Sequence, residues 1–499
     1  MSFWSDARVR AALELPDTTS VHGLDYAAVS TDTRNMPADA LFVALRGERF
    51  DGHEFIGQAV AAGAEGAVVE RVPEGAPEIT YYVVPDTLVA LGMLARYYRR
   101  QLTGRVLAIT GANGKTTTKE LVRAVLACRF RTHATAGNLN NLVGAPQTLL
   151  AAPPDAEAIV VELGTNAPGE VARLAGIVAA DACIVTGIAE EHLEGLGDLE
   201  GVLREETSLL PTLPKSGFAV VADDPPALAQ RARSLGTRTL VAGWTERADD
   251  ALRAEEVRIE ANGHVAFRWQ GRTVELGLSA RHNARNALLA LGVGMEWGVD
   301  PDAAAAALKG VRPGKLRGEI AHYGDLTVLV DCYNANPSSM LAAVDTLMAL
   351  PGRARVAVIG TMLELGPRSA EIHRDVAHAL AGSRLDLVIA TGDFCDAFKP
   401  FVQAMDGRLV RVHDPLEAFQ VLEARLRGDE TVLIKGSHGV AMERLLPLIE
   451  KTWSASRPHG EAARPRVGSH HQPDEHGRPA GRAPGDTPGG SDEALRGGN

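Results

Sequence analysis

The stretch Thr110-Gly111-Ala112-Asn113-Gly114-Lys115-Thr116-Thr117-Thr118 joins an apolar run at 106–109 to a helical pattern at 116–127. Strand, glycine turn and helix in this order are typical of a phosphate-binding loop in an α/β sheet. The glycines let backbone amides approach phosphates, Lys115 would neutralise the β and γ oxygens, and the Thr116 hydroxyl would hold Mg²⁺. Ile109 stands where the standard pattern has its first glycine, so a polar turn before a helix is the alternative interpretation.

The chain on both sides of this loop alternates between strand-like and helical segments, which predicts parallel sheets with helices on their faces. Three apolar runs follow the loop at 158–163, 182–188 and 218–222. After Arg317 the pattern restarts, and four runs indicate a second doubly wound unit at 326–330, 356–359, 387–390 and 432–434. A last helix is predicted over 440–450. Residues 1 to about 103, with apolar runs at 40–45 and 66–69 and a helix at 55–62, fit a small α/β domain.

Length and composition limit the class of protein. The chain has 499 residues, which at roughly 150 per domain predicts about three domains. Its net charge of −12 argues against a general binder of nucleic acid or anionic membranes. Four cysteines without a CxxC pair are expected to be reduced thiols: Cys128, Cys183, Cys332 and Cys395. The N-terminus has no continuous apolar core and no run of about 20 apolar residues follows, so we expect a cytoplasmic protein without membrane insertion.

The end of the chain has a different composition. After about Trp453 the sequence shifts to Pro, Gly, His, Arg and Asp with almost no large apolar residue, which predicts a disordered tail over 453–499. The His470-His471 pair could bind a metal, and a solvated low-complexity tail is the simpler interpretation.

Polar residues follow several predicted strands, at the edge where open α/β sheets bind ligands. Glu162 ends one apolar run and is a candidate Mg²⁺ ligand. His192 follows another strand and is a candidate for a second metal, with an ordinary surface histidine as the alternative. The loop at 135–146 carries three asparagines, which suit either a polar substrate or an ordinary turn. The loops at 331–340 and 435–439 directly follow strands on the same kind of edge.

Five motifs together resemble the ATP-dependent Mur ligases of bacterial peptidoglycan synthesis, over about residues 25 to 450. They are GANGKTTTKE, GNLNNLVGAPQTLL, ELGTNAPGE, DCYNANPSSM and LELG at 363–366, in the order that this family has them. GNLNN and DCYNANPSSM favour the branch that adds D-alanyl-D-alanine over other Mur branches and over the folylpolyglutamate synthetases.

The resemblance implies a three-domain α/β architecture with a central P-loop ATPase domain and a Rossmann-like C-terminal domain. The expected ranges are 1–103 for the UDP-substrate domain, 104–316 for the ATPase domain and 317–452 for the domain that closes over the site. The residues matching the UDP-sugar pattern are Asp32, Thr33, Arg34, Arg46, Gly47, Asp51 and His53. Those facing the muramoyl peptide or the substrate side are Asn138, Asn140, Asn141, Asn334, Asn336, Ser338, Lys435 and Ser437.

The same resemblance assigns the nucleotide and metal positions. Residues matching the ATP site are Gly111, Asn113, Gly114, Lys115, Thr116, Thr117, Asn283, Asn286, Arg317 and Asp331. Lys115, Glu162 and His192 would be catalytic, and Thr116, Glu162 and His192 would hold Mg²⁺. Arg317 and Asp331 would reach ATP when the C-terminal domain closes.

Four positions depart from the family pattern. Glu206 stands where related ligases often carry a lysine, carbamylated in some of them, and Thr361 replaces the aspartate of GDMLELG. Leu142 and His438 replace a common acidic residue and a frequent arginine. The ATP loop and Glu162 are intact, so we expect an active enzyme with altered fine positioning.

The resemblance therefore implies ATP-dependent ligation of D-alanyl-D-alanine to UDP-N-acetylmuramoyl-tripeptide through an acyl phosphate, with a monomer expected. Diaminopimelate and lysine are both compatible with the third peptide position. A ligase with another acceptor is one alternative. A nucleotide-binding regulatory protein that has lost catalysis is another, suggested by Thr361 and Glu206.

Overall fold

The computed structural model describes residues 3–16, 23–47 and 50–454. The tail was predicted over 453–499, but Trp453 is helical and buried, so its predicted start was wrong. Residues 455–499, including His470 and His471, lie outside the described residues. Cys128, Cys183, Cys332 and Cys395 are free. Among the described helices, none has the length and apolar character that a membrane span requires.

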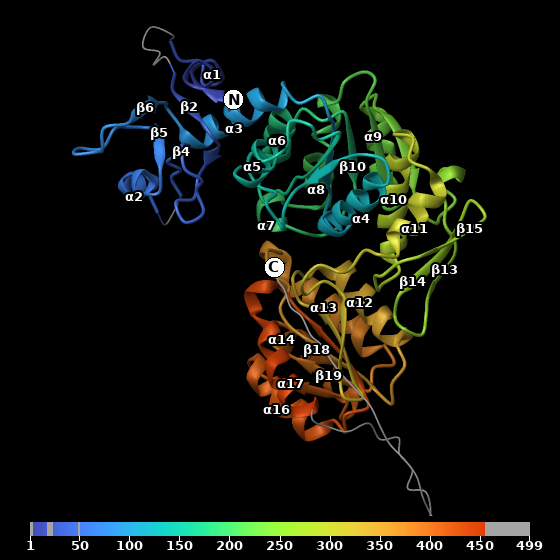
Figure 1. Ribbon diagram of the computed structural model, residues 1–499. Coiled ribbons are helices and arrows are strands. Elements are labelled where there is room, and N and C mark those ends of the chain that lie inside the picture. Colours follow the sequence, from blue (N-terminus) through green and yellow to red (C-terminus); the bar gives the residue numbers. More distant parts are fainter. Residues whose placement is uncertain (1–2, 17–22, 48–49, 455–499) are drawn as a thin grey trace, which may run out of the picture. The chain divides into compact units, whose positions relative to one another are not determined.

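The phosphate loop belongs to a six-stranded parallel sheet, as the sequence predicted (Figure 1). Its strand order is β12-β11-β10-β7-β9-β8. The strands are β7 (Arg105–Thr110), β8 (Thr132–Ala134), β9 (Ala158–Glu162), β10 (Ala182–Val185), β11 (Phe218–Ala222) and β12 (Arg238–Ala242). Val106 and Ala108 of β7 belong to one hydrophobic cluster, and Leu107 and Ile109 belong to another. Because both faces of the sheet are apolar, helices must cover both.

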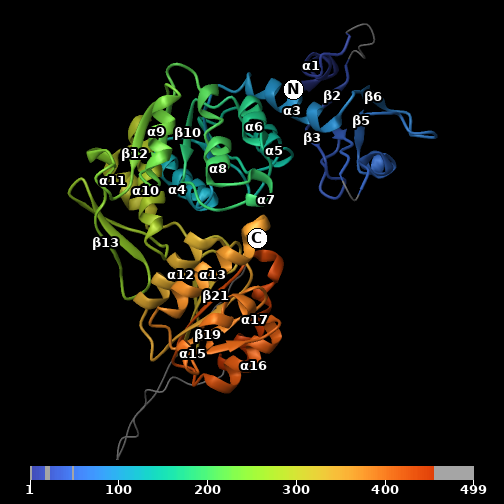
Figure 2. The same ribbon diagram turned by 180° about the vertical axis from the view of Figure 1, so that it is seen from behind.

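Those helices pack on the two faces (Figures 1 and 2). The face of Leu107 packs against α4 (Lys115–Ala127), α10 (His282–Glu296) and α11 (Pro301–Leu308). The face of Val106 packs against α3 (Thr87–Arg99), α5 (Gly144–Leu150), α6 (Glu170–Val178), α8 (Leu199–Glu206) and α9 (Pro226–Ser234). The predicted strand over 182–188 is shorter in the structure: β10 ends at Val185, and Gly187 adopts a φ of 151° in the loop that follows.

An antiparallel sheet that the sequence analysis did not predict packs beside α10. It consists of β13 (Glu255–Ile259), β14 (Val265–Trp269) and β15 (Arg272–Glu275). Val265, Phe267 and Trp269 alternate along β14 and are buried. The turn between β14 and β15 has Gln270 at a φ of 49° and Gly271 at 76°, which suits a tight hairpin.

A second six-stranded sheet forms the C-terminal part, with strand order β16-β17-β21-β18-β19-β20. Its strands are β16 (Glu319–Tyr323), β17 (Leu326–Asp331), β18 (Arg355–Ile359), β19 (Leu387–Ala390), β20 (Leu409–Arg411) and β21 (Thr431–Lys435). The edge strand β16 is antiparallel and the others are parallel. The helices are α12 (Pro337–Ala349), α13 (Ser369–Ala381), α14 (Phe394–Ala397), α15 (Val402–Met405), α16 (Pro415–Arg425) and α17 (Leu445–Trp453).

The prediction of a continuous helix over 440–450 was wrong at its start. Ala441 adopts a φ of 58°, which interrupts the chain between two short 3₁₀ turns, so α17 begins at Leu445. The helix then continues through Trp453, whose side chain is buried in the core of the C-terminal sheet.

The N-terminal part contains a four-stranded parallel sheet, in the order β3-β4-β5-β6. Its elements are β3 (Val29–Ser30), β4 (Ala40–Val43), β5 (Ala64–Val69), β6 (Thr80–Val83) and α2 (Ile56–Ala61). A short strand pair and a helix precede it: β1 (Trp4–Ser5), β2 (Asp25–Tyr26) and α1 (Asp6–Ala12). One hydrophobic cluster runs from Trp4 and Tyr26 through Leu94 of α3 to Val106 and Ile159 of the central sheet.

Candidate active site

The loop between β7 and α4 depends on two glycines. Gly111 has a φ of 121°, and a Cβ there would collide with Oγ1 of Thr186. Gly114 has a φ of 82°, and a Cβ there would lie 2.8 Å from Nδ2 of Asn286. Gly114 also precedes α4, whose N-terminus has no side-chain cap in the described structure. The Gly111 amide donates to Glu206 and the Ala112 amide donates to the Gly187 carbonyl oxygen. A phosphate would therefore be bound by the amides that follow, at the start of α4.

Lys115 lies over its own loop among acidic side chains. Its Nζ donates hydrogen bonds to the carbonyl oxygens of Gly111 at 2.7 Å and Ala112 at 3.3 Å. Burial alone would lower the pKa of Lys115, but the carboxylates of Glu191, Glu206 and Glu162 outweigh it and raise that pKa. Lys115 is therefore a cation wherever the protein is folded near neutral pH.

Glu206, which stands where related ligases often carry a lysine, hydrogen-bonds the start of the phosphate loop. Its Oε2 accepts hydrogen bonds from the Gly111 amide at 2.8 Å and from the Thr110 hydroxyl. Burial raises the pKa of Glu206, although the charge of Lys115 and these hydrogen bonds oppose the shift. This oxygen therefore holds the start of the phosphate loop through one backbone bond and one side-chain bond.

Glu162 ends β9, as the sequence predicted, and its side chain is buried. Its Oε1 accepts hydrogen bonds from the Thr116 hydroxyl at 3.0 Å and from Asn140 Nδ2 at 2.9 Å. Its Oε2 is buried and has no hydrogen-bond partner among the described residues, with Lys119 Nζ 3.9 Å away. An unpartnered buried carboxylate oxygen beside a threonine hydroxyl fits a hard divalent cation.

His192 lies between two carboxylates. Its Nδ1 hydrogen-bonds Glu364 Oε2, and its Nε2 lies 3.5 Å from Glu191 Oε1. Burial would lower the pKa of His192, but the hydrogen bond with Glu364 and the charge of Glu191 raise it overall. In the described structure no three His, Cys, Asp or Glu side chains converge closely enough to hold a metal ion by themselves. A cation at this site would therefore need ligands from a bound phosphate as well, which is how Mg²⁺ is usually held beside nucleotides.

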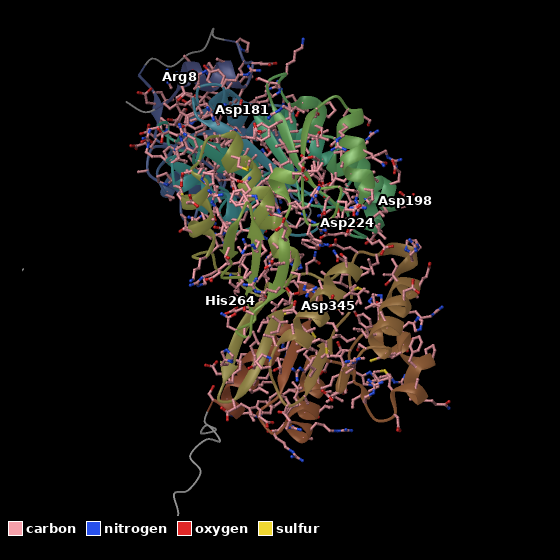
Figure 3. The ribbon with its side chains drawn as sticks, turned by 90° about the vertical axis from the view of Figure 1, so that its right-hand side faces the viewer. Arg8, Asp181, Asp198, Asp224, His264 and Asp345 are labelled. Atoms are coloured by element: carbon pink, nitrogen blue, oxygen red, sulfur yellow. The ribbon has the colours of Figure 1, made fainter. Side chains whose placement is uncertain are left out.

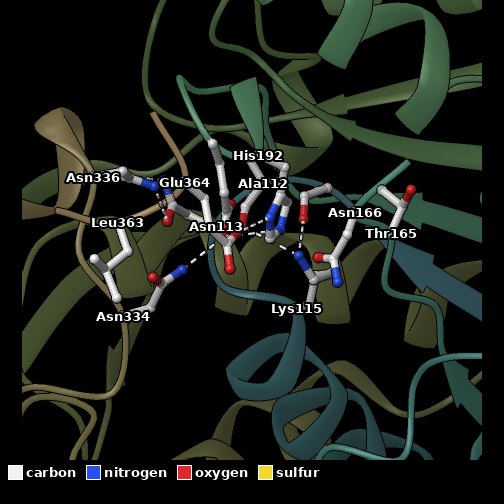
Figure 4. Close-up of polar contacts among 12 residues, drawn as sticks. Ala112, Asn113, Lys115, Thr165, Asn166, His192, Asn334, Asn336, Leu363 and Glu364 are labelled. Carbon is white, nitrogen blue, oxygen red and sulfur yellow. Dashed lines mark hydrogen bonds and ion pairs between the residues drawn. The ribbon is translucent and has the colours of Figure 1, made fainter. Parts of the chain in front are cut away.

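The DCYNAN loop after β17 contacts the phosphate loop (Figure 4). Asn336 Nδ2 donates to Asn113 Oδ1 at 2.8 Å, and Asn113 Nδ2 donates to Ser338 Oγ at 3.1 Å. Asn334 Nδ2 donates to Glu191 Oε1 at 2.6 Å. The structure thus brings the phosphate loop into direct contact with residues of the C-terminal sheet that were predicted to face the substrate.

Asp331 and Lys435 end adjacent strands of the C-terminal sheet. Lys435 Nζ donates to Asp331 Oδ2 at 2.8 Å and to the Asn334 carbonyl oxygen at 2.9 Å, which fixes the start of the DCYNAN loop. Ser437 Oγ accepts from the Leu363 amide at 3.0 Å. Together these bonds join the ends of β17, β18 and β21 on one edge.

Tyr333 contacts three other residues that the sequence analysis named. The guanidinium carbon of Arg317 lies 3.7 Å from the ring centroid, and the ring of His438 stacks on Tyr333 at 5.8 Å. The hydroxyl of Tyr333 accepts from Asn138 Nδ2 at 2.9 Å. His438, one of the departures from the family pattern, therefore makes an aromatic contact that an arginine would make differently.

The other two departures have local roles. Thr361 Oγ1 accepts from the Asp393 amide at 3.0 Å and closes the loop after β19. Leu142 packs against the hydrophobic cluster of the central sheet. Neither change disturbs the contacts of Lys115 or Glu162.

Asn283 and Asn286, which the resemblance assigns to the ATP site, lie at the start of α10. Asn286 Nδ2 donates to Asn283 Oδ1 at 2.9 Å, and both are buried. The sequence analysis missed a neighbouring group: Asp223, at the end of β11, accepts from Arg285 Nε at 2.7 Å, and Arg285 lies 4.2 Å from the Trp244 ring centroid. Its signal was Asp223 directly after an apolar run, the same signal that identified Glu162.

These groups surround a cavity of about 820 Å³. Asp224 and Asp345, marked in Figure 3, contribute to its wall. The predicted residues that line it are Asn113, Gly114, Lys115, Thr116, Thr117, Asn140, Glu162, His192, Asn283, Asn286, Arg317, Asp331, Asn334, Ser338, Lys435 and Ser437. Asn138 lines a second cavity of about 630 Å³ together with Thr116, Lys119 and Arg317. Asn141 accepts from the amides of Val143 and Gly144 and shapes the start of α5.

The predicted UDP residues lie elsewhere, in two groups on the N-terminal part. Arg34 and Asp32 form an exposed ion pair at 2.7 Å next to Thr33. Asp51 Oδ1 lies 2.6 Å from His53 Nδ1, and Arg46 Nη1 lies 3.2 Å from Glu70 Oε2, with Gly47 adjacent. Thr31, next to Asp32, accepts from Gln147 Nε2 at 2.6 Å, which joins the first group to α5, the helix that follows the loop of Asn140.

Comparison with known proteins agrees with this geometry. Three family patterns match in order: Mur ligase family, catalytic domain, at residues 25–99; Mur ligase middle domain at 109–294; and Mur ligase, glutamate ligase domain, at 316–438. The UDP-N-acetylmuramoyl-tripeptide–D-alanyl-D-alanine ligase of Bacillus subtilis (strain 168) is 34% identical over 449 residues, covering 88% of this chain and 95% of that protein.

Solved structures give the same result. A crystal structure of MurF from Acinetobacter baumannii superposes with a TM-score of 0.80 at 30% identity, covering 90% of this chain and 99% of that one. A MurF ligase from Thermotoga maritima in complex with ADP gives 0.73 at 27% identity, covering 85% and 97%. The chain therefore belongs to the Mur ligase family, in the branch of the UDP-N-acetylmuramoyl-tripeptide–D-alanyl-D-alanine ligases.

Proposed function

We propose that this chain joins D-alanyl-D-alanine to UDP-N-acetylmuramoyl-tripeptide at the expense of ATP. The observation that carries the proposal is the convergence of three distant motifs on one cavity. Asn140 of the GNLNN loop contacts Glu162, and Asn336 of the DCYNAN loop contacts Asn113 of the phosphate loop. These two motifs are the ones that favoured this branch of the family in the sequence.

The chemistry follows from the charges around Lys115. A carboxylate is a poor electrophile, so the terminal carboxylate of the tripeptide attacks the γ-phosphate and becomes an acyl phosphate, with ADP leaving. The amine of D-alanyl-D-alanine then attacks the acyl carbon and phosphate leaves. Lys115, held over its loop by Gly111 and Ala112, counters the charge on the transferred group.

Mg²⁺ would be held by Thr116 and Glu162 at one position and by His192 at another, with phosphate oxygens completing each set. When bound, Mg²⁺ supplies positive charge to the phosphates. Without it, the three carboxylates around Lys115 would repel the phosphates. Glu162 presents its unpartnered Oε2 for this purpose, and Thr116 presents its hydroxyl beside it.

The two loops of the C-terminal sheet protect the intermediate from water. An acyl phosphate exposed to solvent would hydrolyse before the amine arrived. Asn336 and Ser338 contact Asn113, and Asn138 contacts Tyr333, so the phosphate loop and the substrate loop are both bridged to the C-terminal sheet. Arg317 and Asp331 line the same cavity. This supports the proposal that they reach ATP when the C-terminal domain closes.

The UDP end of the substrate is assigned to the N-terminal part, through the groups around Asp32 and Arg46. The bond from Gln147 to Thr31 supports this, because Thr31 adjoins Asp32 and Gln147 belongs to α5, which directly follows the loop that carries Asn140. A monomer is expected from the resemblance, and light scattering with substrates present tests it.

The decisive experiment measures phosphate release with ATP, Mg²⁺ and UDP-N-acetylmuramoyl-tripeptide, with and without D-alanyl-D-alanine, followed by mass analysis. Release that requires both substrates and yields the pentapeptide nucleotide is the expected result. Release with a different amine would identify another acceptor. ATP binding by folded protein without release under any condition would indicate a regulatory protein instead.

A further inference from the structure

Glu191, a carboxylate at the edge of the cavity, raises the pKa values of Lys115 and His192 through its charge, and the function proposed above assigns it no ligand. Glu191 exposes 7% of its surface, and its Oε2 has no hydrogen-bond partner among the described residues. Leaving a buried carboxylate oxygen unpaired is costly, so a ligand that fills this gap would relieve a real penalty.

The neighbours of Glu191 indicate what that ligand is. His192 Nε2 lies 3.5 Å from Glu191 Oε1, and the carboxylate faces a cavity that must also accept a triphosphate. Glu206, the other carboxylate on this side, already accepts two hydrogen bonds from the phosphate loop at Oε2. The carboxylate next to the imidazole that still has an unpaired oxygen, Oε2, is therefore that of Glu191, and a divalent cation is the ligand that both side chains suit.

We propose that Glu191 binds the same divalent cation as His192, so that two adjacent residues of one loop supply two of its ligands. The remaining ligands are phosphate oxygens of the nucleotide, since the described side chains do not form a complete set. This inference rests on the proposed function only in its use of a nucleotide at the phosphate loop.

Both ligands are oriented by the C-terminal sheet. Asn334 Nδ2 donates to Glu191 Oε1 at 2.6 Å, which leaves Oε2 for the cation. Glu364 hydrogen-bonds Nδ1 of His192, which leaves Nε2 as the metal-binding nitrogen (Figure 4). A carboxylate behind a metal-binding histidine is a common arrangement, because it fixes the ring and its tautomer. Asn334 and Glu364 are thus positioning residues. The two cation ligands are held in place only when the loops that carry Asn334 and Glu364 contact the central sheet.

The test uses Mn²⁺ as the probe and the full chain with a saturating non-hydrolysable ATP analogue. Electron paramagnetic resonance counts the bound Mn²⁺, and the unaltered protein should bind two ions per chain. Glu191→Gln, which keeps the shape and removes the charge, should weaken the second ion by at least about tenfold. Glu190→Gln is the matched control, because Glu190 is the adjacent carboxylate and pairs with Arg368 at 3.7 Å outside the cavity wall.

Two further variants test the positioning residues. Asn334→Ala keeps the charge of Glu191 and should weaken the second ion by several-fold, up to about tenfold. Glu364→Ala should do the same, and Glu364→Gln should restore much of the affinity because its side-chain oxygen can still accept from Nδ1 of His192. These variants also answer the case in which Glu191→Gln fails to fold.

The inference is overturned if the unaltered protein binds a single Mn²⁺, or if Glu191→Gln and Asn334→Ala both bind two ions with unaltered affinity. Neither result depends on peptide ligation. A protein that binds two Mn²⁺ and makes no pentapeptide would refute the proposed function alone, and a protein that makes it while Glu191→Gln binds Mn²⁺ normally would refute the cation site alone.

Discussion

Helices α4 and α12 both begin at the carboxyl edge of a parallel sheet, yet their N-termini are treated in opposite ways. Gly114 precedes α4 and provides no side-chain cap. Asn336 precedes α12 and forms a capping box, in which its side chain accepts from the Ser339 amide at 2.9 Å and Ser339 Oγ accepts from the Asn336 amide at 3.0 Å. The first helix leaves its amides for an anion, and the second satisfies them internally.

This difference shows that the sheet edge alone does not make a phosphate site. The residue before the helix decides it, because a glycine with positive φ leaves room for an anion and an asparagine fills the same space. Asn336 uses its remaining amide hydrogens to reach Asn113. The N-terminus of α12 therefore contacts the loop before α4 and does not present a phosphate site of its own.

The strongest test of this comparison removes the charge at the uncapped helix. Lys115→Ala should lower turnover by at least about a hundredfold, because no other lysine sits over the phosphate loop in the described structure. Circular dichroism and the melting temperature should show that the fold is kept. Full activity in a folded variant would disprove the role of Lys115.

The next test fills the space before α4. Gly114→Ala forces a side chain into a φ of 82° and against Asn286, so it should cost about 1 to 3 kcal/mol of stability and weaken ATP binding by at least roughly tenfold. Calorimetric titration of the nucleotide measures this. Gly176→Ala, within α6 and with open space at its Cβ, is the control and should leave ATP binding unchanged.

A third test removes the cap of α12. Asn336→Ala should cost about 1 kcal/mol and also lower kcat by roughly tenfold, because the contact with Asn113 is lost. Asp414→Ala is a close control: Asp414 caps α16 with nearly the same backbone angles, a φ of −144° and a ψ of 171°. It should lose the same stability with unaltered kcat. Equal kcat losses in both variants would mean that the cap of α12 has no specific role at the site.

The smallest effect concerns Glu206, which accepts a hydrogen bond from the Gly111 amide and so withdraws that amide from phosphate binding. Burial raises its pKa in the folded protein, so between the unfolded and folded pKa values the folded state binds more protons. Stability should therefore fall as pH rises through that window. Glu206→Gln should flatten this part of the curve, as melting temperatures from about pH 4 to about pH 8 would show. An unchanged slope would contradict the shift.

Much of this comparison was predictable from sequence, because it depends on local patterns. The glycine turn before residues 116–127 and the apolar runs that became β7, β9, β11, β17 and β18 have the periodicity of their elements. Glu162 was identifiable because a polar residue directly follows a buried strand. The capping box was readable in principle from the Asn336-Pro337-Ser338-Ser339 pattern.

The rest depends on contacts between residues far apart in the chain. The unpaired oxygen of Glu191, the bond from Glu364 to His192 and the pairing of Asp223 with Arg285 follow from which strands lie side by side. The antiparallel strands β13 to β15 were missed because short alternating strands resemble loops when read singly. The start of α17 was misplaced because a positive φ at Ala441 has no signal in its residue type.

The hydrophobic cluster that joins Trp4 and Leu94 to Val106 and Ile159 has a consequence for how the molecule unfolds. Since the N-terminal sheet and one face of the central sheet share this cluster, denaturant should melt them as one cooperative unit. The C-terminal sheet has two clusters of its own, one of which also takes in Leu193 and Leu196. A nucleotide that contacts both the central sheet and the C-terminal sheet would stabilise them together and merge two unfolding transitions into one. The number of transitions in a denaturation curve would then report whether the cavity is occupied.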